Sequence, residues 1–152
     1  MTKFLLDTNV LSEFSRSAAP PDVHVKKWIE SIDPAALFTS VLSLGEIRRG
    51  IELLPDGKKR RELEAWVDVD LRGWFGPNLL PITRAIANRW GILDAQCQQR
   101  GTPLGNIDGL LAATALEHEL VVATRNLRHF TSLVGTISPW EPDAISLMKP
   151  SI

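Results

Sequence analysis

The chain has 152 residues, of which 44% are hydrophobic and 23% are charged, and this composition excludes wholesale disorder and fits one globular domain with a sizeable core. The formal net charge of −1 excludes a protein that coats duplex nucleic acid with a broadly basic surface. With a single cysteine, Cys97, no intrachain disulfide bond can form, and with no signal-like N-terminus or long apolar run we expect a soluble, cytoplasmic protein.

The first part of the chain alternates short apolar runs with helical patterns. The run over residues 3–6 is too short for a helix, and its apolar residues predict a buried strand. A short helix is predicted after it, over 10–15. Apolar residues over 25–32 recur at helical spacing and predict a helix that Pro34 stops. A second short strand is predicted over 36–40.

The middle of the chain is predicted to be mainly helical. A helix is expected over 42–54, and a longer one over 58–75 has one apolar face. The dipeptide Gly-Pro at 76–77 breaks this helix, and residues 79–82 predict a third strand.

The last part returns to the alternating pattern. Residues 83–101 predict an amphipathic helix closed by Gly101, and residues 106–119 predict a helix that is apolar on nearly all sides. Strands are predicted over 120–124 and, at an edge of the sheet, over 136–138.

This alternation predicts an α/β domain with three layers, in which helices cover both faces of a mostly parallel sheet of four to five strands. We expect one domain over residues 1–145 and a tail over 146–152. In such sheets ligands bind beyond the carboxyl ends of the strands.

Polar side chains stand at those predicted strand ends. Asp7 follows the first strand, Glu46 lies one turn into the helix after the second, Asp108 opens the buried helix, and Asn126 follows the strand over 120–124. Three carboxylates brought together without basic partners repel one another, and a hard divalent cation removes that repulsion. We therefore expect a site for Mg²⁺ or Mn²⁺ that activates water for the cleavage of a phosphodiester bond.

Each carboxylate also has a purely structural explanation. Asp7 is a favoured residue for capping a helix N-terminus, and Ser43 with Glu46 fits the capping-box pattern. Asp108 lies behind Asn106, a candidate N-cap, where the helix dipole favours an acidic residue.

Four stretches closely resemble the PIN-domain ribonucleases, and most nearly the toxins of the VapC and FitB type. They are LLDTNVLSE (5–13), TSVLSLGEIRRGIELL (39–54), IDGLLAATALEHEL (107–120) and VVATRNLRHF (121–130). The resemblance implies a PIN-like fold and a metal-dependent endoribonuclease, inhibited by a small antitoxin encoded beside it. It also implies a homodimer.

By position, the resemblance assigns Asp7, Glu46 and Asp108 to the acidic triad of the family and Asn126 to a fourth polar position that is Asp in many relatives. It implies that small polar residues support the site: Thr8, Asn9, Ser40 and Thr124. One residue departs from the pattern, because His129 stands where family members commonly have Asp. Two neutral residues at this end of the pocket predict weak binding of any second metal ion.

Arginines near the predicted pocket are candidates for contact with RNA phosphates, because a guanidinium group suits phosphate bidentately. They are Arg48, Arg49 and Arg125. An antitoxin helix could dock on the amphipathic faces of 25–32 or 42–54, with a basic residue that reaches the carboxylates.

Two other functions remain open from the sequence. A catalytically silent module could keep the fold and bind RNA or protein, as the neutral Asn126 and His129 would allow. The other is phosphotransfer on Asp7. This reaction requires an aspartate two residues later as the general acid, and that position is occupied by Asn9, which cannot donate the proton.

Overall fold

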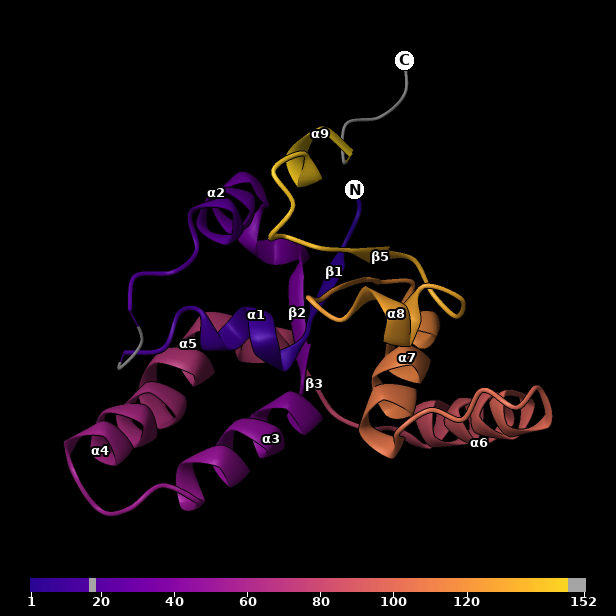
Figure 1. The fold of residues 1–152 in the computed structure, drawn as a ribbon, viewed down its shortest axis with the longest axis horizontal. Helices are drawn as coiled ribbons and strands as arrows, with labels where there is room; N and C mark the ends of the chain where they lie inside the picture. The colour runs from indigo at the N-terminus through magenta and orange to yellow at the C-terminus, as the bar shows by residue number, and fades with distance from the viewer. Residues whose placement is uncertain (17–18, 148–152) are drawn as a thin grey trace.

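The computed structural model describes residues 1–16 and 19–147 of the chain. Its centre is a sheet of five parallel strands in the order β3-β2-β1-β4-β5 (Figure 1). The strands are β1 (Phe4–Leu6), β2 (Leu37–Ser40), β3 (Leu79–Leu80), β4 (Val121–Ala123) and β5 (Thr136–Ile137). The parallel sheet and the edge position of the strand near 136 are as predicted from the sequence.

β1 is the central strand and pairs with β2 on one side and β4 on the other. In the register of the sheet, Phe4 lies opposite Leu37 and Val121. Because all strands run the same way, the residues that follow β1, β2, β4 and β5 meet at one edge of the sheet. This edge holds the candidate site.

Helices cover both faces of the sheet. The α-helices are α1 (Thr8–Ser12), α2 (Val23–Ser31), α3 (Val41–Glu52), α4 (Lys58–Ala65), α5 (Arg72–Phe75), α6 (Arg84–Gln99), α7 (Asn106–His118), α8 (Leu127–Phe130) and α9 (Ala144–Leu147). Short 3₁₀ turns, η1 (Pro34–Ala36) and η3 (Gly76–Asn78), precede β2 and β3. In Figure 1, α1 to α5 lie on one side of the sheet and α6 to α8 on the other. This is the predicted three-layer arrangement.

The core is divided between the two faces by the alternation of side chains along the strands. Phe4 and Leu6 pack into the cluster beneath α1, α2, α3 and α5, where the Phe4 and Trp28 rings meet edge to face at 5.0 Å. Leu5 and Val122 point the other way, into the cluster beneath α7 and α8. The small residues of α7 let this helix pack closely on the sheet, as its apolar sequence predicted.

The helix predicted over 58–75 is confirmed in its bounds, but it is not a regular α-helix throughout. α4 gives way to a π-helical segment, η2 (Trp66–Leu71), before α5 begins at Arg72. The wide turn keeps Trp66 and Leu71 in the core and leaves Asp68 and Asp70 on the outside. There Asp68 forms an ion pair with Arg48, and Asp70 forms one with Arg16. Both acidic residues of the π-helical turn are thus paired with arginines from other segments.

The start of the first helix also differs from the prediction. The helix expected over 10–15 begins at Thr8, because Asp7 caps it. The domain boundary expected at 145 stays a prediction: residues Ala144–Leu147 form α9, and the part of the predicted tail over 148–152 lies outside the described residues. Within residues 1–16 and 19–147, no helix combines the length and the apolar character needed to cross a membrane.

Candidate functional site

The site is built around Asp7, which follows the central strand. Its backbone N–H donates to the carbonyl oxygen of Ala123 at 3.0 Å, and this bond extends the pairing of β1 and β4 to the edge of the sheet. Asp7 is only 6% exposed, although it carries a carboxylate. A buried carboxylate requires hydrogen-bond partners, and the next residues supply them.

Both oxygens of the Asp7 carboxylate accept hydrogen bonds. The backbone N–H of Thr8 donates to Oδ1 at 2.8 Å, and the hydroxyl of Thr124 donates to Oδ2 at 2.8 Å. The amide of Asn9 donates to Oδ2 at 3.4 Å. Asp7 therefore caps α1 and also occupies the predicted site, so the two explanations of this residue hold together.

Thr8 also connects Asp7 to Glu46. Its hydroxyl donates to Oε1 of Glu46 at 2.7 Å, which joins the start of α1 to the second turn of α3. The capping box expected from Ser43 and Glu46 is wrong, because the hydroxyl of Ser40 accepts the N–H of Leu42 and caps α3 one turn earlier. Glu46 is thus free to face Thr8.

Ser43 lies inside α3 and is fully buried, and its hydroxyl has no hydrogen-bond partner in the described part of the chain. A residue whose hydroxyl is left unpaired in this way contributes packing and no cap. The sequence pattern was misleading because it places a helix start at either Ser40 or Ser43, which are three residues apart.

Asp108 lies in the first turn of α7, as predicted. The expected N-cap at Asn106 is wrong: Gly105 occupies that position, and no side chain caps the helix. Oδ2 of Asp108 lies 2.8 Å from Nδ1 of His129 on α8. An imidazole nitrogen at this distance from a carboxylate oxygen is placed to pair with it, so His129 faces Asp108 across the site.

The contact of His129 with Asp108 was missed from the sequence. The substitution of His at a position that is commonly Asp in PIN-domain ribonucleases was the available signal. The sequence could not show that α8 turns this side chain toward α7, because the contact joins two helices that are separated by β4.

The three carboxylates influence one another electrostatically. Burial is the largest cause that raises the pKa of Asp7 above its ordinary value, and the negative charge of Asp108 raises it further. Burial likewise raises the pKa of Glu46, with additions from the charges of Asp7 and Asp108. Hydrogen bonds from Thr124 to Asp7 and from Thr8 to Glu46 act in the opposite direction. The site therefore accumulates negative charge that the protein itself neutralises only in part.

The side chains do not form a closed cage for an ion. Among residues 1–16 and 19–147, no group of three or more His, Cys, Asp and Glu side chains is placed to hold a metal ion. Each carboxylate is turned instead toward its own partner, which is Thr124 for Asp7, Thr8 for Glu46 and His129 for Asp108.

The remaining predicted supporting residues lie at the same edge of the sheet. Ser40 and Thr124 are fully buried at the ends of β2 and β4. The hydroxyl oxygen of Thr124 accepts the backbone N–H of Asn126 at 3.0 Å, so Asn126 is tied to the site through its main chain. Asn126 stands at the N-cap of α8 without a hydrogen bond from its side chain to that helix.

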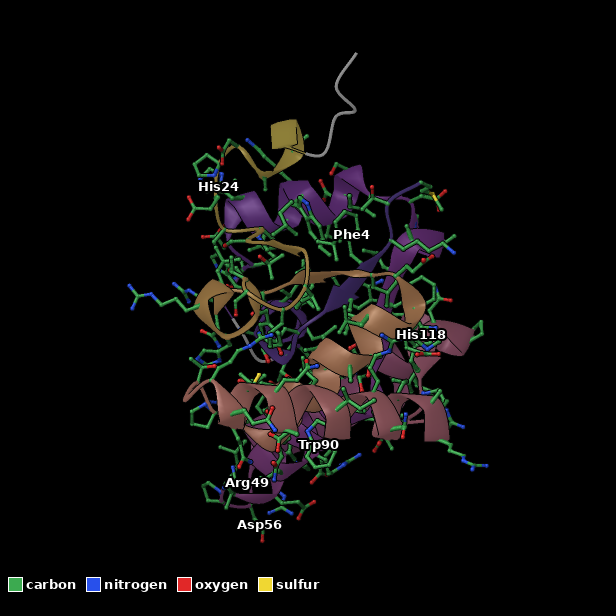
Figure 2. The ribbon with its side chains drawn as sticks, turned by 90° about the vertical axis from the view of Figure 1, so that its right-hand side faces the viewer. Phe4, His24, Arg49, Asp56, Trp90 and His118 are labelled. Atoms are coloured by element: carbon green, nitrogen blue, oxygen red, sulfur yellow. The ribbon has the colours of Figure 1, made fainter. Side chains whose placement is uncertain are left out.

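The three predicted arginines have different surroundings. Arg48 pairs with Asp68 on the opposite side of α3 from Glu46, so the structure does not bring it to the carboxylates. Arg49 is exposed in the last turn of α3, at the lower end of the molecule in Figure 2. Arg125 directly follows Thr124, and its backbone N–H donates to Oδ1 of Asn9 at 3.2 Å.

A cleft of about 410 Å³ begins beside the carboxylates. Thr8 and Glu46 are among its lining residues, and the other residues that line it come from the α1 region, α3, α4 and η2, among them Ile51, Leu63 and Trp66. The other docking face predicted from the sequence, over 25–32, is not available: Val25 and Trp28 of α2 are fully buried in the core.

Comparison with known proteins agrees with this arrangement. Residues 4–133 match the family described as PIN domain. The chain is 33% identical over 139 residues to VapC ribonuclease Y4jK of Sinorhizobium fredii (strain NBRC 101917 / NGR234), covering 91% of this chain and 98% of that protein. It is 32% identical over 137 residues to toxin FitB of Neisseria gonorrhoeae (strain ATCC 700825 / FA 1090), covering 90% and 97%. The solved structure of FitAcB from Neisseria gonorrhoeae superposes with a TM-score of 0.83 at 31% identity, over 91% of this chain and 99% of that one.

Proposed function

Because this chain belongs to the PIN domain family, we propose that it is a metal-dependent endoribonuclease that hydrolyses RNA phosphodiester bonds and acts in the cytoplasm as the toxin of a toxin–antitoxin pair. One observation carries the proposal: Asp7, Glu46 and Asp108 come from three separate elements, Thr8 hydrogen-bonds to both Asp7 and Glu46, and the charge of Asp108 raises the pKa of these two carboxylates. The names of the two relatives, a VapC ribonuclease and a toxin, support the same activity.

The donor set fits Mg²⁺ or Mn²⁺. Asp7, Glu46 and Asp108 offer carboxylate oxygens, which are the ligands that hard cations prefer, and Mg²⁺ needs only one or two carboxylates because it keeps several waters. Two of these carboxylates are therefore sufficient, and a closed three-residue cage is not required. Bound there, the ion would lower the pKa of a water molecule and neutralise charge on the phosphodiester.

The chain's own residues hold the acidic groups in place. Thr124 and Thr8 fix the two oxygens of Asp7, and the Thr8 hydroxyl fixes Glu46. Nδ1 of His129 orients the Asp108 carboxylate. A ligand that is fixed by such outer contacts loses little conformational freedom when it binds an ion, so these contacts prepare the site for its cation.

The test is RNA cleavage by the purified chain, with and without EDTA, and with Mg²⁺ or Mn²⁺ restored. Cleavage that stops in EDTA and returns with either ion supports the proposal. Asp7→Asn and Asp108→Asn keep the size of the side chains and remove their charge, so both variants should lose at least a hundredfold in rate. Wild-type rates in both variants would show that the site is assigned wrongly.

A second candidate function is a catalytically silent module that binds RNA or protein. It is favoured by the position of His129, whose Nδ1 lies 2.8 Å from Oδ2 of Asp108 and so occupies an oxygen that a cation would use. RNA binding without cleavage at any concentration of Mg²⁺ or Mn²⁺ would support this function, and metal-restored cleavage would exclude it.

We further propose that the antitoxin docks in the cleft between α1, α3 and α4. The cleft combines apolar walls, such as Ile51 and Leu63, with the carboxylate of Glu46 at one end. It suits an amphipathic segment that ends in a basic side chain able to reach the carboxylates. Crosslinks between the antitoxin and residues of this cleft would support the proposal, and crosslinks confined to α6 and α7 would contradict it. Light scattering would test the homodimer that the family resemblance implies.

A further inference from the structure

Trp140 lies just beyond β5, at the same edge of the sheet as Asp7. Its backbone follows Ser138, the first residue after a strand that runs parallel to β4. The indole Nε1–H donates to Oε1 of Glu13, at the end of α1, at 3.2 Å. The ring is partly buried against the core, so both its position and its rotation are fixed.

The guanidinium group of Arg125 lies over this ring. Its Cζ is 5.2 Å from the centre of the Trp140 ring, within the range of a cation–π contact. Within the described residues Arg125 has no carboxylate partner at ion-pair distance, in contrast to Arg48, which pairs with Asp68. Its positive charge is therefore available to a ligand.

The same arginine is attached to the carboxylate site. It directly follows Thr124, whose hydroxyl donates to Asp7, and its backbone N–H donates to Asn9. Its backbone is therefore fixed next to the site, while its guanidinium group pairs with none of the three carboxylates in the described part of the chain. A phosphate that neighbours the one to be cleaved would meet it.

We propose that Trp140 is a positioning residue for RNA. It holds the Arg125 side chain extended, with the guanidinium group over the ring, so that the guanidinium N–H groups meet an RNA phosphate next to the scissile one. This proposal depends on the proposed ribonuclease function. An unsupported arginine has many side-chain conformations and must lose that freedom on binding, whereas the ring and the Glu13 hydrogen bond remove part of this cost beforehand. Trp140 lies outside residues 4–133, the range that matches the PIN domain family.

The first experiment measures steady-state cleavage of a short single-stranded RNA by Trp140→Leu and Trp140→Phe. Loss of a cation–π contact at a partly exposed site corresponds to roughly a two- to fivefold effect, so we expect Trp140→Leu to raise KM by about this factor and to leave kcat nearly unchanged. Trp140→Phe keeps an aromatic face under Arg125 and should recover most of the wild-type KM. Trp74→Leu, which removes a partly buried tryptophan from a different aromatic cluster, is the matched control and should keep the wild-type KM.

The second experiment measures binding of the same labelled RNA to Asp7→Asn protein, which we expect to bind without cleaving. Arg125→Ala should weaken binding and lower the slope of log K against log salt by about 0.7, the value for one phosphate contact on a single strand. Adding Trp140→Leu to Arg125→Ala should have no further effect, because the tryptophan acts through the arginine.

Two outcomes would overturn the inference. One is an unchanged KM in Trp140→Leu. The other is that Trp140→Leu lowers the affinity for RNA equally in the protein that has Arg125 and in the Arg125→Ala variant. Failure of the proposed function is separate, because the wild-type protein would then cleave no RNA under any metal condition. A wild-type protein that cleaves RNA while Trp140→Leu retains its KM overturns only the role of Trp140.

Discussion

The hydroxyl of Thr8 donates to Oε1 of Glu46 at 2.7 Å, across 38 residues of sequence. The backbone N–H of the same threonine donates to Asp7. A single residue thus fixes two of the three carboxylates, from β1 and from α3, and the geometry of the site depends on it.

Thr8→Val should therefore reduce activity more than stability. Valine keeps the shape of threonine but cannot donate to Glu46, which we propose as a metal ligand, and loss of a hydrogen bond to such a ligand typically costs about 10- to 100-fold in activity or metal affinity. The free energy of unfolding should fall by only about 1 kcal/mol. Measurement of kcat/KM and of thermal unfolding checks both effects. Thr8→Ser keeps the hydroxyl and is the control; equal rates in the two variants would contradict the role of this bond.

Asp7→Asn should stabilise the metal-free protein while it abolishes cleavage. The pKa of Asp7 is raised in the folded state, mainly by burial, so its ionised form costs stability at neutral pH. The folded protein binds more protons than the unfolded chain between the two pKa values, and stability therefore falls as the pH rises through this range. Thermal unfolding in EDTA should show a higher Tm for Asp7→Asn at pH 7 to 8, with a difference that shrinks as the pH falls toward 4. A lower Tm for the variant throughout would contradict this explanation.

His129→Asp should make the fold more dependent on metal. The change replaces a hydrogen-bond donor beside Asp108 with a second negative charge, so repulsion should lower the Tm in EDTA. The added carboxylate should also increase the rise in Tm on addition of Mn²⁺, because a ligand that binds only the folded state stabilises it more when it binds more tightly. His129→Asn, which can donate without a charge, is the control. Equal increments for the two variants would show that this position does not influence the cation.

Gly109→Ala should disturb the helix that carries Asp108. A Cβ atom on Gly109 would lie 2.9 Å from Nε1 of Trp90, closer than real Cβ contacts allow, and would push α6 away from α7. Figure 2 labels Trp90 on α6. Overpacking of this kind costs about 1–3 kcal/mol, measurable by denaturant unfolding. Gly91→Ala on α6 meets no atom within 4 Å and should be neutral or stabilising.

The Trp90 side chain allows a check of that explanation. Its indole Nε1 is buried without a hydrogen-bond partner in the described part of the chain. Trp90→Phe removes this group and gives space to a new methyl, so the double variant with Gly109→Ala should regain part of the lost stability. If the double variant is as unstable as Gly109→Ala alone, the steric explanation is wrong.

The sequence predicted the sheet because β-strand and helix signals in this chain rarely conflict. Apolar runs such as Phe4–Leu6 cannot be anything but buried strands, and their alternation with helices implies parallel pairing. Asp7 and Asp108 could be placed because each directly follows or opens an element whose end was clear.

The remaining features depend on contacts between distant segments. The spacing of apolar residues around Trp66–Leu71 fits a regular α-helix nearly as well as it fits a π-helical turn, so the sequence could not predict that turn. The pairings of His129 with Asp108 and of Arg48 with Asp68 are set by how helices rotate on the sheet, which local spacing does not determine. For the same reason the sequence could not distinguish the three arginines.

The bond between Thr124 and Asp7 spans 117 residues, and this separation affects how the protein is made. β1 leaves the ribosome first, but Asp7 cannot gain its partner until β4 has been synthesised and paired with β1. A nascent chain therefore cannot complete the site before residue 124 has been synthesised. Truncated products that end before residue 124 lack the hydrogen-bond partner of Asp7, and we expect them to show no cleavage activity.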